Sequence, residues 1–438
     1  MKNNADLTTD GWRGLPARNW SEREIVGRAL GLATAIEGTI AVGYDSRAGS
    51  RDLAVLVGRA LTTMGHECAI ASRPTPTPAV GRYVSAHEGI AGGIIITASH
   101  NPPGDIGIKV RGGDGLPFDG DLPTAAWDID ALVASLRPGP DSVDITGHYR
   151  DTIGRSFLES ANGFDGLVVF DAMYGVVGVL AELAGPVGWR RSVAAPYFLG
   201  GTPDPVLRCQ AEPAMKAALL ACGDPSHGIV FMTDGDGDRL CAYTKAAGYI
   251  TSTELAMALI RDGLDVRTVI ATQVAESALR ETADRAELDY ASTFVGFKNI
   301  IAHWKAVGRP AALGVEPNGG LALSQEPDSY FERDGIAGAA RVLRQFRSVA
   351  ELDAVIHRVR IERRFEPRQF TTTRPADSVC STIQARWPDG TVQEMDGIAR
   401  LSWPDGARVL LRQSGTEAVV RCYVEGPEEM LTWFQRAI

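Results

Sequence analysis

The chain has 438 residues, 45% hydrophobic and 22% charged, a composition typical of a folded globular protein that excludes a disordered or fibrous chain. With 44 basic and 54 acidic residues, its net charge of -10 argues against nucleic-acid binding through bulk positive charge. The six cysteines have no CxxC spacing and the first residues have no apolar signal segment, so we expect reduced thiols and a cytoplasmic location. No apolar run approaches the roughly 20 residues of a membrane-spanning helix, which predicts no membrane partner.

The first 125 residues alternate between helical and strand-like patterns. Ser21 and Glu24 have the spacing of a capping box at the start of a helix, and Ser50 is expected to cap a second helix over 51–65. The continuous apolar run at 92–99 is typical of a strand buried on both faces. This β/α alternation predicts a mostly parallel sheet.

The same alternation restarts twice further along the chain. Strand-like runs precede polar loops at 233–239 and 314–320, and such loops at the carboxyl ends of parallel strands are where ligands bind. From about residue 348 the pattern changes to one helix and then to hairpin-like segments with turns at 388–390 and 404–406, which predicts an antiparallel α+β segment. We therefore expect four domains, over residues 1–147, 148–246, 247–350 and 351–438.

Three carboxylates alternate with glycines at Asp234, Asp236 and Asp238, directly after an apolar run. Glycine adds no steric bulk, so the three carboxylates can wrap one hard cation with oxygen ligands, and Mg²⁺ is the natural candidate. An EF-hand is excluded, because Arg239 stands where that loop needs glycine and Lys245 where it needs a bidentate glutamate. The alternative is a solvated acidic turn, in which three carboxylates so close together would repel one another.

A hydroxyl group follows the apolar strand of the first domain. Ser99 stands at the strand terminus beside His100, which suits a nucleophile or a carrier of a phosphoryl group. The nucleophile elbow of the α/β-hydrolases is excluded, because its GxSxG pattern is replaced here by Thr97 and Asn101 around the serine. Taken alone, the segment fits a capped turn better than a catalytic loop.

Two further loops offer groups for an anionic sugar ligand. Glu316 and Asn318 lie between glycines and suit recognition of sugar hydroxyls, although, taken alone, the segment fits a plain turn better. Hydroxyls, backbone N–H groups and guanidinium groups that together suit a phosphate occur near the C-terminus, at Arg412, Ser414, Gly415, Thr416 and Arg421. The spacing is not that of a P-loop, and a structural turn with two surface arginines is the alternative.

In this order, the four loops resemble those of the α-D-phosphohexomutase family, the phosphoglucomutases and phosphomannomutases. TASHNP resembles the phosphoserine loop of that family, DGDGDR its magnesium loop, GVEPNGG its sugar-recognition loop and RQSGTEAVVRCYVE its phosphate-binding loop. Shorter matches are TDGWRG at 9–14, VGYDSR at 42–47, GIK at 107–109 and GFK at 296–298. The resemblance covers essentially the whole chain.

The resemblance implies an α/β fold with three similar mixed-sheet α/β domains and a C-terminal α+β lid domain around one central cleft. It implies reversible conversion of a hexose 1-phosphate to a hexose 6-phosphate through a phosphoserine and a sugar 1,6-bisphosphate. Mg²⁺ would be held by Ser99, Asp234, Asp236 and Asp238. The implied catalytic residues are Ser99, His100, Lys109, Arg13 and Arg239. The implied substrate-binding residues are Arg47, Lys298, Glu316, Asn318, Arg412, Ser414, Gly415, Thr416 and Arg421.

The sugar-recognition loop departs from the pattern GExSG that is common in the family. Pro317 and Asn318 follow Glu316, where a flexible or acidic residue and a serine are usual, and Gly320 occupies a position that is histidine in some members. Hydroxyl recognition should therefore differ, which leaves an aminohexose or pentose phosphate open as substrate. A non-catalytic sugar-phosphate-binding paralogue and a phosphosugar phosphatase are the rival functions.

Overall fold

The computed structural model describes residues 11–14, 22–120, 127–326, 329–395, 397–413 and 419–437. Its first domain contains strands β1 (Trp12–Gly14), β2 (Thr39–Tyr44), β3 (Cys68–Ala71), β4 (Ile90–Ile96), β5 (Ile106–Arg111) and β6 (Ser142–Val143), and helices α1 (Glu22–Ala35), α2 (Ser50–Thr63), α3 (Thr77–Ala86) and α4 (Ile129–Ala134). The strands form one sheet in the order β1-β5-β4-β2-β3-β6. Strands β4, β2, β3 and β6 are parallel, and β5 and β1 extend that sheet in antiparallel fashion.

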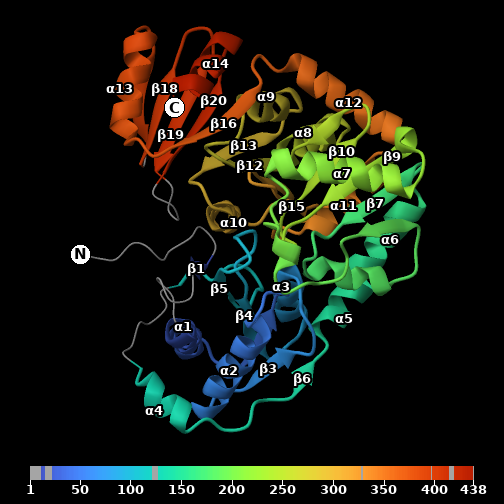
Figure 1. Cartoon of the computed structure of the whole chain (residues 1–438), viewed down its shortest axis with the longest axis vertical. Helices are drawn as coiled ribbons and strands as arrows, with labels where there is room; N and C mark the ends of the chain where they lie inside the picture. The colour runs from blue at the N-terminus through green and yellow to red at the C-terminus, as the bar shows by residue number, and fades with distance from the viewer. Residues whose placement is uncertain are drawn as a thin grey trace.

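The second and third domains repeat this plan of parallel strands with an antiparallel extension (Figure 1). The second sheet has the order β11-β10-β9-β7-β8 and contains β7 (Leu167–Asp171), β8 (Val187–Arg190), β9 (Gly228–Met232), β10 (Cys241–Thr244) and β11 (Gly248–Ile250). The third has the order β13-β12-β14-β15 and contains β12 (Thr268–Thr272), β13 (Asp289–Thr293), β14 (Ala312–Glu316) and β15 (Gly320–Ser324). Their helices are α5 (Ile145–Tyr149), α6 (Arg155–Asn162), α7 (Arg208–Cys222), α8 (Ser252–Arg261), α9 (Ser277–Arg285), α10 (Phe297–Ala306) and α11 (Gly335–Gln345).

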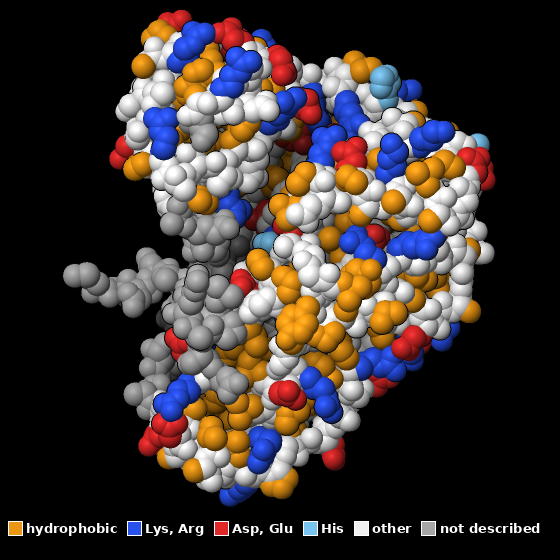
Figure 2. Space-filling view, viewed as in Figure 1, with side chains coloured by type: hydrophobic (Ala, Val, Ile, Leu, Met, Phe, Trp, Pro, Cys, Tyr) orange, Lys and Arg blue, Asp and Glu red, His pale blue; other side chains and the backbone are white. Residues whose placement is uncertain are grey.

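The fourth domain is an antiparallel sheet with helices, reached through α12 (Val349–Glu362). Its elements are β16 (Pro367–Thr372), α13 (Ala376–Arg386), β17 (Thr391–Met395), β18 (Ile398–Ser402), β19 (Arg408–Gln413), β20 (Val420–Glu425) and α14 (Glu428–Ala437). It has a hydrophobic core of its own, whereas one cluster of buried side chains joins the second and third domains. In the space-filling view this C-terminal lobe stands off from the rest of the chain, with a hollow between them (Figure 2).

Buried parallel strands explain why the polar loops come together. The last five residues of β4 and all residues of β9, β12 and β14 are buried, as expected for apolar strands covered by helices on both faces. Parallel strands end at the same edge of a sheet, so the polar residues that follow them gather at that edge. Among the described residues, no helix has the length and apolar character needed to cross a membrane.

Several sequence-based expectations need correction. Ser50 is the first residue of α2 and not its cap; Gly49 precedes it with φ of 80°, and the Ser50 hydroxyl donates instead to Asp45 at 2.7 Å. The turn at 404–406 joins β18 to β19 as predicted, but the turn at 388–390 joins α13 to β17, so a hairpin there is wrong. Ser21 lies outside the described residues.

The expected domain boundaries fall inside helices or within a hairpin of one sheet. The boundary at 246 lies within the β10–β11 hairpin of the second sheet, because β11 pairs with β10 over three residues. The boundaries at 147 and 350 lie inside α5 and α12, respectively. These helices therefore link neighbouring domains without a flexible loop at those positions.

One buried carboxyl group at the junction with the fourth domain predicts a pH-dependent stability. Burial raises the pKa of Glu276 from 4.5 to about 7, although Arg363, at 2.9 Å, opposes the shift and Glu254 and Glu425 reinforce it. Because the folded state binds this proton more tightly than the unfolded chain, the stabilisation is complete below about pH 4.5 and is lost as the pH rises towards 7. Glu276→Gln should flatten this part of the dependence of unfolding free energy on pH. Glu281→Gln is the matched control, because Glu281 is exposed on α9, the helix that Glu276 precedes. An unchanged slope of unfolding free energy against pH in Glu276→Gln would contradict the assignment.

Candidate active site

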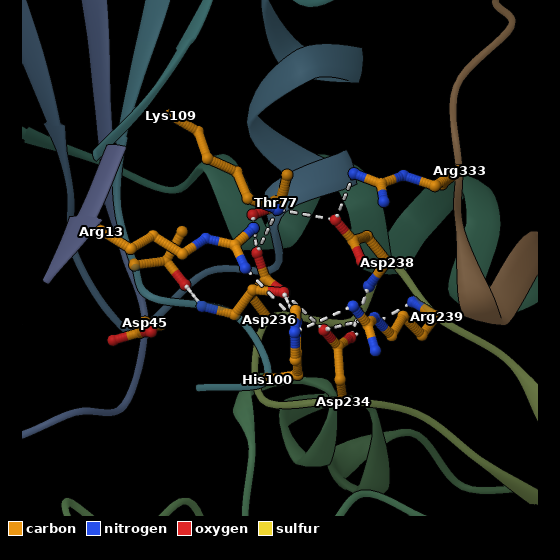
Figure 3. A network of polar contacts seen from close by, with 12 residues as sticks. Arg13, Asp45, Thr77, His100, Lys109, Asp234, Asp236, Asp238, Arg239 and Arg333 are labelled. Atoms are coloured by element: carbon orange, nitrogen blue, oxygen red, sulfur yellow. Dashed lines mark hydrogen bonds and ion pairs between the residues drawn. The ribbon is translucent and has the colours of Figure 1, made fainter. Parts of the chain in front are cut away.

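Loops from the first three domains converge on one cluster of charged side chains (Figure 3). His100 follows β4, Lys109 lies within β5 and the three aspartates follow β9. Lys109 Nζ lies 2.8 Å from Asp236 Oδ2 and 2.6 Å from Asp238 Oδ2, and all three side chains are buried. The first two domains are thus held together by ion pairs at this cluster.

Ser99 lies in the same cluster, in a strained backbone conformation. Its φ is 52°, in the left-handed region that a residue with a β-carbon adopts only at a cost. Its amide donates to the Thr97 hydroxyl at 2.8 Å, and its own hydroxyl donates to Asp234 Oδ2 at 2.7 Å. The predicted phosphoryl carrier is therefore in direct contact with the predicted metal ligands.

Arg47 supports the loop that carries Ser99. Its five N–H groups donate to the Asp45 carboxylate and to the backbone carbonyls of Ser99, Asn101, Pro102 and Asp105. Since a guanidinium has five donors, none is left for a ligand. This buried side chain holds the Ser99 loop in place, and the expectation that Arg47 also binds substrate stays a prediction.

Both oxygens of Asp234 accept hydrogen bonds, Oδ2 from Ser99 and Oδ1 from the amides of Asp238 and Arg239, whereas Asp236 and Asp238 accept on one oxygen each. Asp236 Oδ2 accepts from Lys109 and from the Thr77 hydroxyl, and Asp238 Oδ2 accepts from Lys109. The other oxygens, Asp236 Oδ1 and Asp238 Oδ1, are buried and have no hydrogen-bond partner among the described residues. One oxygen from each of the three aspartates lies within 4.8 Å of the others. Unpaired buried oxygens at this spacing fit a hard divalent cation.

The charges of the three carboxylates interact strongly. Burial and the neighbouring Asp236 and Asp238 raise the pKa of Asp234 well above its ordinary value. Burial also disfavours ionisation of Asp236, but the Lys109 ammonium outweighs it, so the pKa of Asp236 lies below its ordinary value. Burial and the two neighbouring carboxylates thus disfavour the ionised form of Asp234, and a cation at this site would favour it.

His100 lies between two arginines. Arg239 Nη2 is 3.1 Å from its Nε2, and Arg13 Nη1 is 3.3 Å from its Nδ1. Burial, followed by the positive charges of Arg239 and Arg13, lowers the pKa of His100 well below its ordinary value, so the ring is neutral. Arg239 also pairs with Asp204 at 2.9 Å. The three predicted catalytic residues His100, Arg13 and Arg239 are thus brought together beside Ser99.

The sugar-recognition loop is the turn between β14 and β15. Glu316 is buried; its Oε1 accepts from the Gly296 amide at 3.0 Å, and its Oε2 has no hydrogen-bond partner among the described residues. Asn318 Oδ1 accepts from the Gly320 amide at 3.2 Å, which leaves its side-chain N–H groups to donate. Lys298 is exposed near the start of α10.

The structure describes only part of the segment of the fourth domain that is predicted to bind phosphate. Arg412 and Arg421 are directly opposite on β19 and β20. Like charges at such positions repel, which favours an anion between them. The positive charge of Arg421 contributes to lowering the pKa of His100. Ser414, Gly415 and Thr416 lie outside the described residues.

Three residues of the cluster were not predicted from the sequence. Thr77 and Asp204 fix Asp236 and Arg239, and Arg333 Nη2 lies 2.9 Å from Asp238 Oδ2. Thr77 and Asp204 carried no signal in the sequence, because each stands as a single polar residue between prolines. Arg333 stands between Glu332 and Asp334, and this pattern is typical of an arginine that forms an ion pair at the surface.

The fold and this site define an enzyme of the phosphohexomutase type, which transfers phosphoryl groups on sugar phosphates. The phosphoglucomutase/phosphomannomutase α/β/α domain I matches residues 6–129, α/β/α domain III matches 248–358 and the C-terminal domain matches 386–432. The chain therefore belongs to the phosphoglucomutase/phosphomannomutase family, whose members are α-D-phosphohexomutases.

Individual relatives agree with this assignment. A phosphoglucosamine mutase from Synechococcus elongatus is 28% identical over 438 residues, covering 92% of this chain and 85% of the relative. A phosphoglucosamine mutase from Mycolicibacterium smegmatis is 28% identical over 415 residues, covering 89% and 84%. In fold, the chain is similar to a family protein from Burkholderia thailandensis, with a TM-score of 0.73, 21% identity and coverage of 100% and 96%.

Proposed function

We propose that this chain interconverts hexose 1-phosphates and hexose 6-phosphates by carrying a phosphoryl group on Ser99. The observation that carries the proposal is the 2.7 Å hydrogen bond from the Ser99 hydroxyl to Asp234, which joins two loops from different domains. A hydroxyl beside an acidic cluster that fits a cation, with Arg13, Lys109 and Arg239 nearby, suits reversible phosphoryl transfer.

The transfer conserves atoms and charge between the serine and the sugar. The bond from phosphorus to Ser99 Oγ breaks while a bond from phosphorus to a sugar hydroxyl oxygen forms; that hydroxyl loses its proton and Ser99 gains one. The product of the first transfer is a sugar 1,6-bisphosphate, which returns its other phosphate to Ser99. Negative charge builds up on the phosphoryl oxygens, and the fixed cations of Arg13, Arg239 and Lys109 stabilise it.

The residues present also fit a metal ion. Asp234, Asp236 and Asp238 would hold Mg²⁺, and this ion would neutralise part of the negative charge on the phosphoryl group. Thr77 and Lys109 orient two of these carboxylates in the way that outer partners orient metal ligands.

We place glucosamine phosphate within the substrate range. The buried Glu316 Oε2 is available to accept a hydrogen bond from a hydroxyl or to pair with the protonated amine of an aminohexose. The two relatives named phosphoglucosamine mutase, which align with about nine tenths of this chain, support this choice.

The test is a panel of glucosamine, glucose and mannose 1-phosphates, with separate measurement of the sugar 6-phosphate and of free phosphate. Conversion to the 6-phosphate without release of free phosphate supports the proposed mutase activity. A preference for glucosamine 1-phosphate supports the proposed substrate. Release of free phosphate without the 6-phosphate would indicate a phosphatase. Binding without turnover would indicate a non-catalytic paralogue.

Arg421→Ala should raise KM for a sugar monophosphate roughly 10- to 100-fold, because a charge-assisted hydrogen bond contributes about 1.5–3 kcal/mol. The bisphosphate should also escape more often between the two transfers, so its release should rise. Arg368→Ala, which removes a more exposed arginine from the adjacent strand β16, is the control. Equal KM values for Arg421→Ala and the native chain would remove Arg421 from the site.

A further inference from the structure

Arg333 lies between the metal loop and the sugar-recognition loop. Its side chain is buried in the segment that joins β15 to α11. Nη2 lies 2.9 Å from Asp238 Oδ2, and Nη1 lies 3.9 Å from Glu316 Oε2. One planar guanidinium therefore faces a carboxylate of each loop.

The guanidinium is held in a defined orientation. Its central carbon lies 5.2 Å from the centre of the Phe297 ring, at the start of α10. Stacking on an aromatic ring and facing two carboxylates from a rigid fork are properties of arginine that lysine lacks. Both Asp238 and Glu316 are almost fully buried, and a buried carboxylate left without a positively charged or hydrogen-bonding partner is costly.

The residues after Arg333 anchor the segment to the other domains. Asp334 accepts hydrogen bonds from Arg82 at 2.9 Å and from the Tyr149 hydroxyl at 2.7 Å, and it caps the start of α11. The Gly335 amide donates to the Gly237 carbonyl at 3.0 Å. A β-carbon at Gly335 would lie 2.5 Å from the Arg239 carbonyl oxygen, so only glycine allows this approach. The position of Arg333 is thus fixed against the metal loop by backbone as well as by side-chain contacts.

We propose that Arg333 is a positioning residue that sets the metal loop and Glu316 relative to each other, and so orients the sugar towards Ser99. The inference rests on the proposed function, in which Glu316 binds the sugar and Asp238 binds the metal. Arg333 itself touches neither the sugar nor the phosphoryl group. It acts through the two carboxylates that it faces.

The test compares Arg333→Lys with Arg363→Lys in the full chain. Arg363 is also a buried arginine between two carboxylates, Glu254 at 2.8 Å and Glu276 at 2.9 Å, but it lies outside the active site. Both variants keep the positive charge but replace the planar guanidinium, which can face two carboxylates, with a single ammonium group. The first readout is the Kd of Mn²⁺ by calorimetry, without substrate. The second is KM and kcat for glucosamine 1-phosphate, in both the native and the Glu316→Gln backgrounds.

Arg333→Lys should weaken Mn²⁺ binding by about tenfold, the lower end of the effect of residues that orient metal ligands. It should also raise KM about tenfold, and this increase should shrink to less than about twofold in the Glu316→Gln background, because the two residues act as a unit. Arg363→Lys should lower the melting temperature but leave the Mn²⁺ Kd unchanged.

A change in only one of the two readouts would overturn the proposal, as would an increase in KM that is the same in both backgrounds. If Arg333→Lys does not fold, Glu316→Gln alone must alter the Mn²⁺ Kd at least about threefold, because it removes the charge of the second carboxylate that Arg333 faces beside Asp238. The Mn²⁺ measurement needs no turnover, so failure of the mutase proposal would show separately, as absence of product from the native chain.

Discussion

Ser99→Ala should lower mutase turnover on the order of 10⁶-fold, the scale of loss when a covalent nucleophile is removed. The Ser99 hydroxyl donates to Asp234 at 2.7 Å and is the group proposed to carry the phosphoryl group. Alanine cannot form the phosphoester, and no other hydroxyl is proposed for this role. Turnover of several sugar phosphates, measured with the purified variant, checks the prediction.

Ser99→Gly separates chemistry from backbone strain. Ser99 has φ of 52°, which glycine adopts freely and alanine does not. The free energy of unfolding of Ser99→Gly should therefore exceed that of Ser99→Ala by about 1 kcal/mol. Both variants should be equally inactive, because both lack the hydroxyl. Substantial activity in either of them would refute the role of Ser99.

Loss of the metal site should reduce turnover by roughly 10³-fold or more, because a cation at a phosphoryl group supplies several kcal/mol of charge stabilisation. Chelation should inactivate the enzyme reversibly, and added Mg²⁺ should restore the rate. Asp234→Asn and Asp236→Asn should each produce the same loss without recovery, because each removes a charged ligand.

The two asparagine variants should differ in stability when metal is absent. Because burial and two neighbouring carboxylates raise the pKa of Asp234, its ionised form costs stability at pH 7, and Asp234→Asn should stabilise the metal-free chain. The pKa of Asp236 lies below its ordinary value beside Lys109, so Asp236→Asn should destabilise the chain. Denaturant unfolding in EDTA measures the free energies of unfolding of the two variants. Full activity of the metal-free protein would exclude the metal site.

The sequence patterns indicated candidate catalytic and metal-binding residues, but not the residues that orient them. Ser99, His100 and the metal loop could be proposed from the residues because each follows a strongly apolar strand, whereas Lys109 was implied only by the family resemblance. That these residues lie close together in space was an expectation from the family resemblance. The structure adds the distances that join Ser99 to Asp234 and Lys109 to Asp236.

Supporting residues could not be predicted, because their role depends on contacts between distant segments. Arg47 has the charge of a phosphate ligand, but its five donors all go to the Ser99 loop and Asp45. Arg333 has acidic neighbours in sequence, yet its partners Asp238 and Glu316 come from other loops. Helix α13 contains the run Val-Cys-Ser-Thr-Ile, whose β-branched residues favour a strand locally, and only its packing on the sheet makes it helical.

The most direct test of the central claim is a single-turnover experiment with phosphorylated enzyme and glucosamine 1-phosphate. Peptide mapping by mass spectrometry should locate the phosphoryl group on Ser99 before mixing. After mixing, glucosamine 1,6-bisphosphate should appear as the phosphoserine disappears, followed by glucosamine 6-phosphate with Ser99 phosphorylated again. Formation of the 6-phosphate with no phosphoryl group on Ser99 at any time would contradict the account.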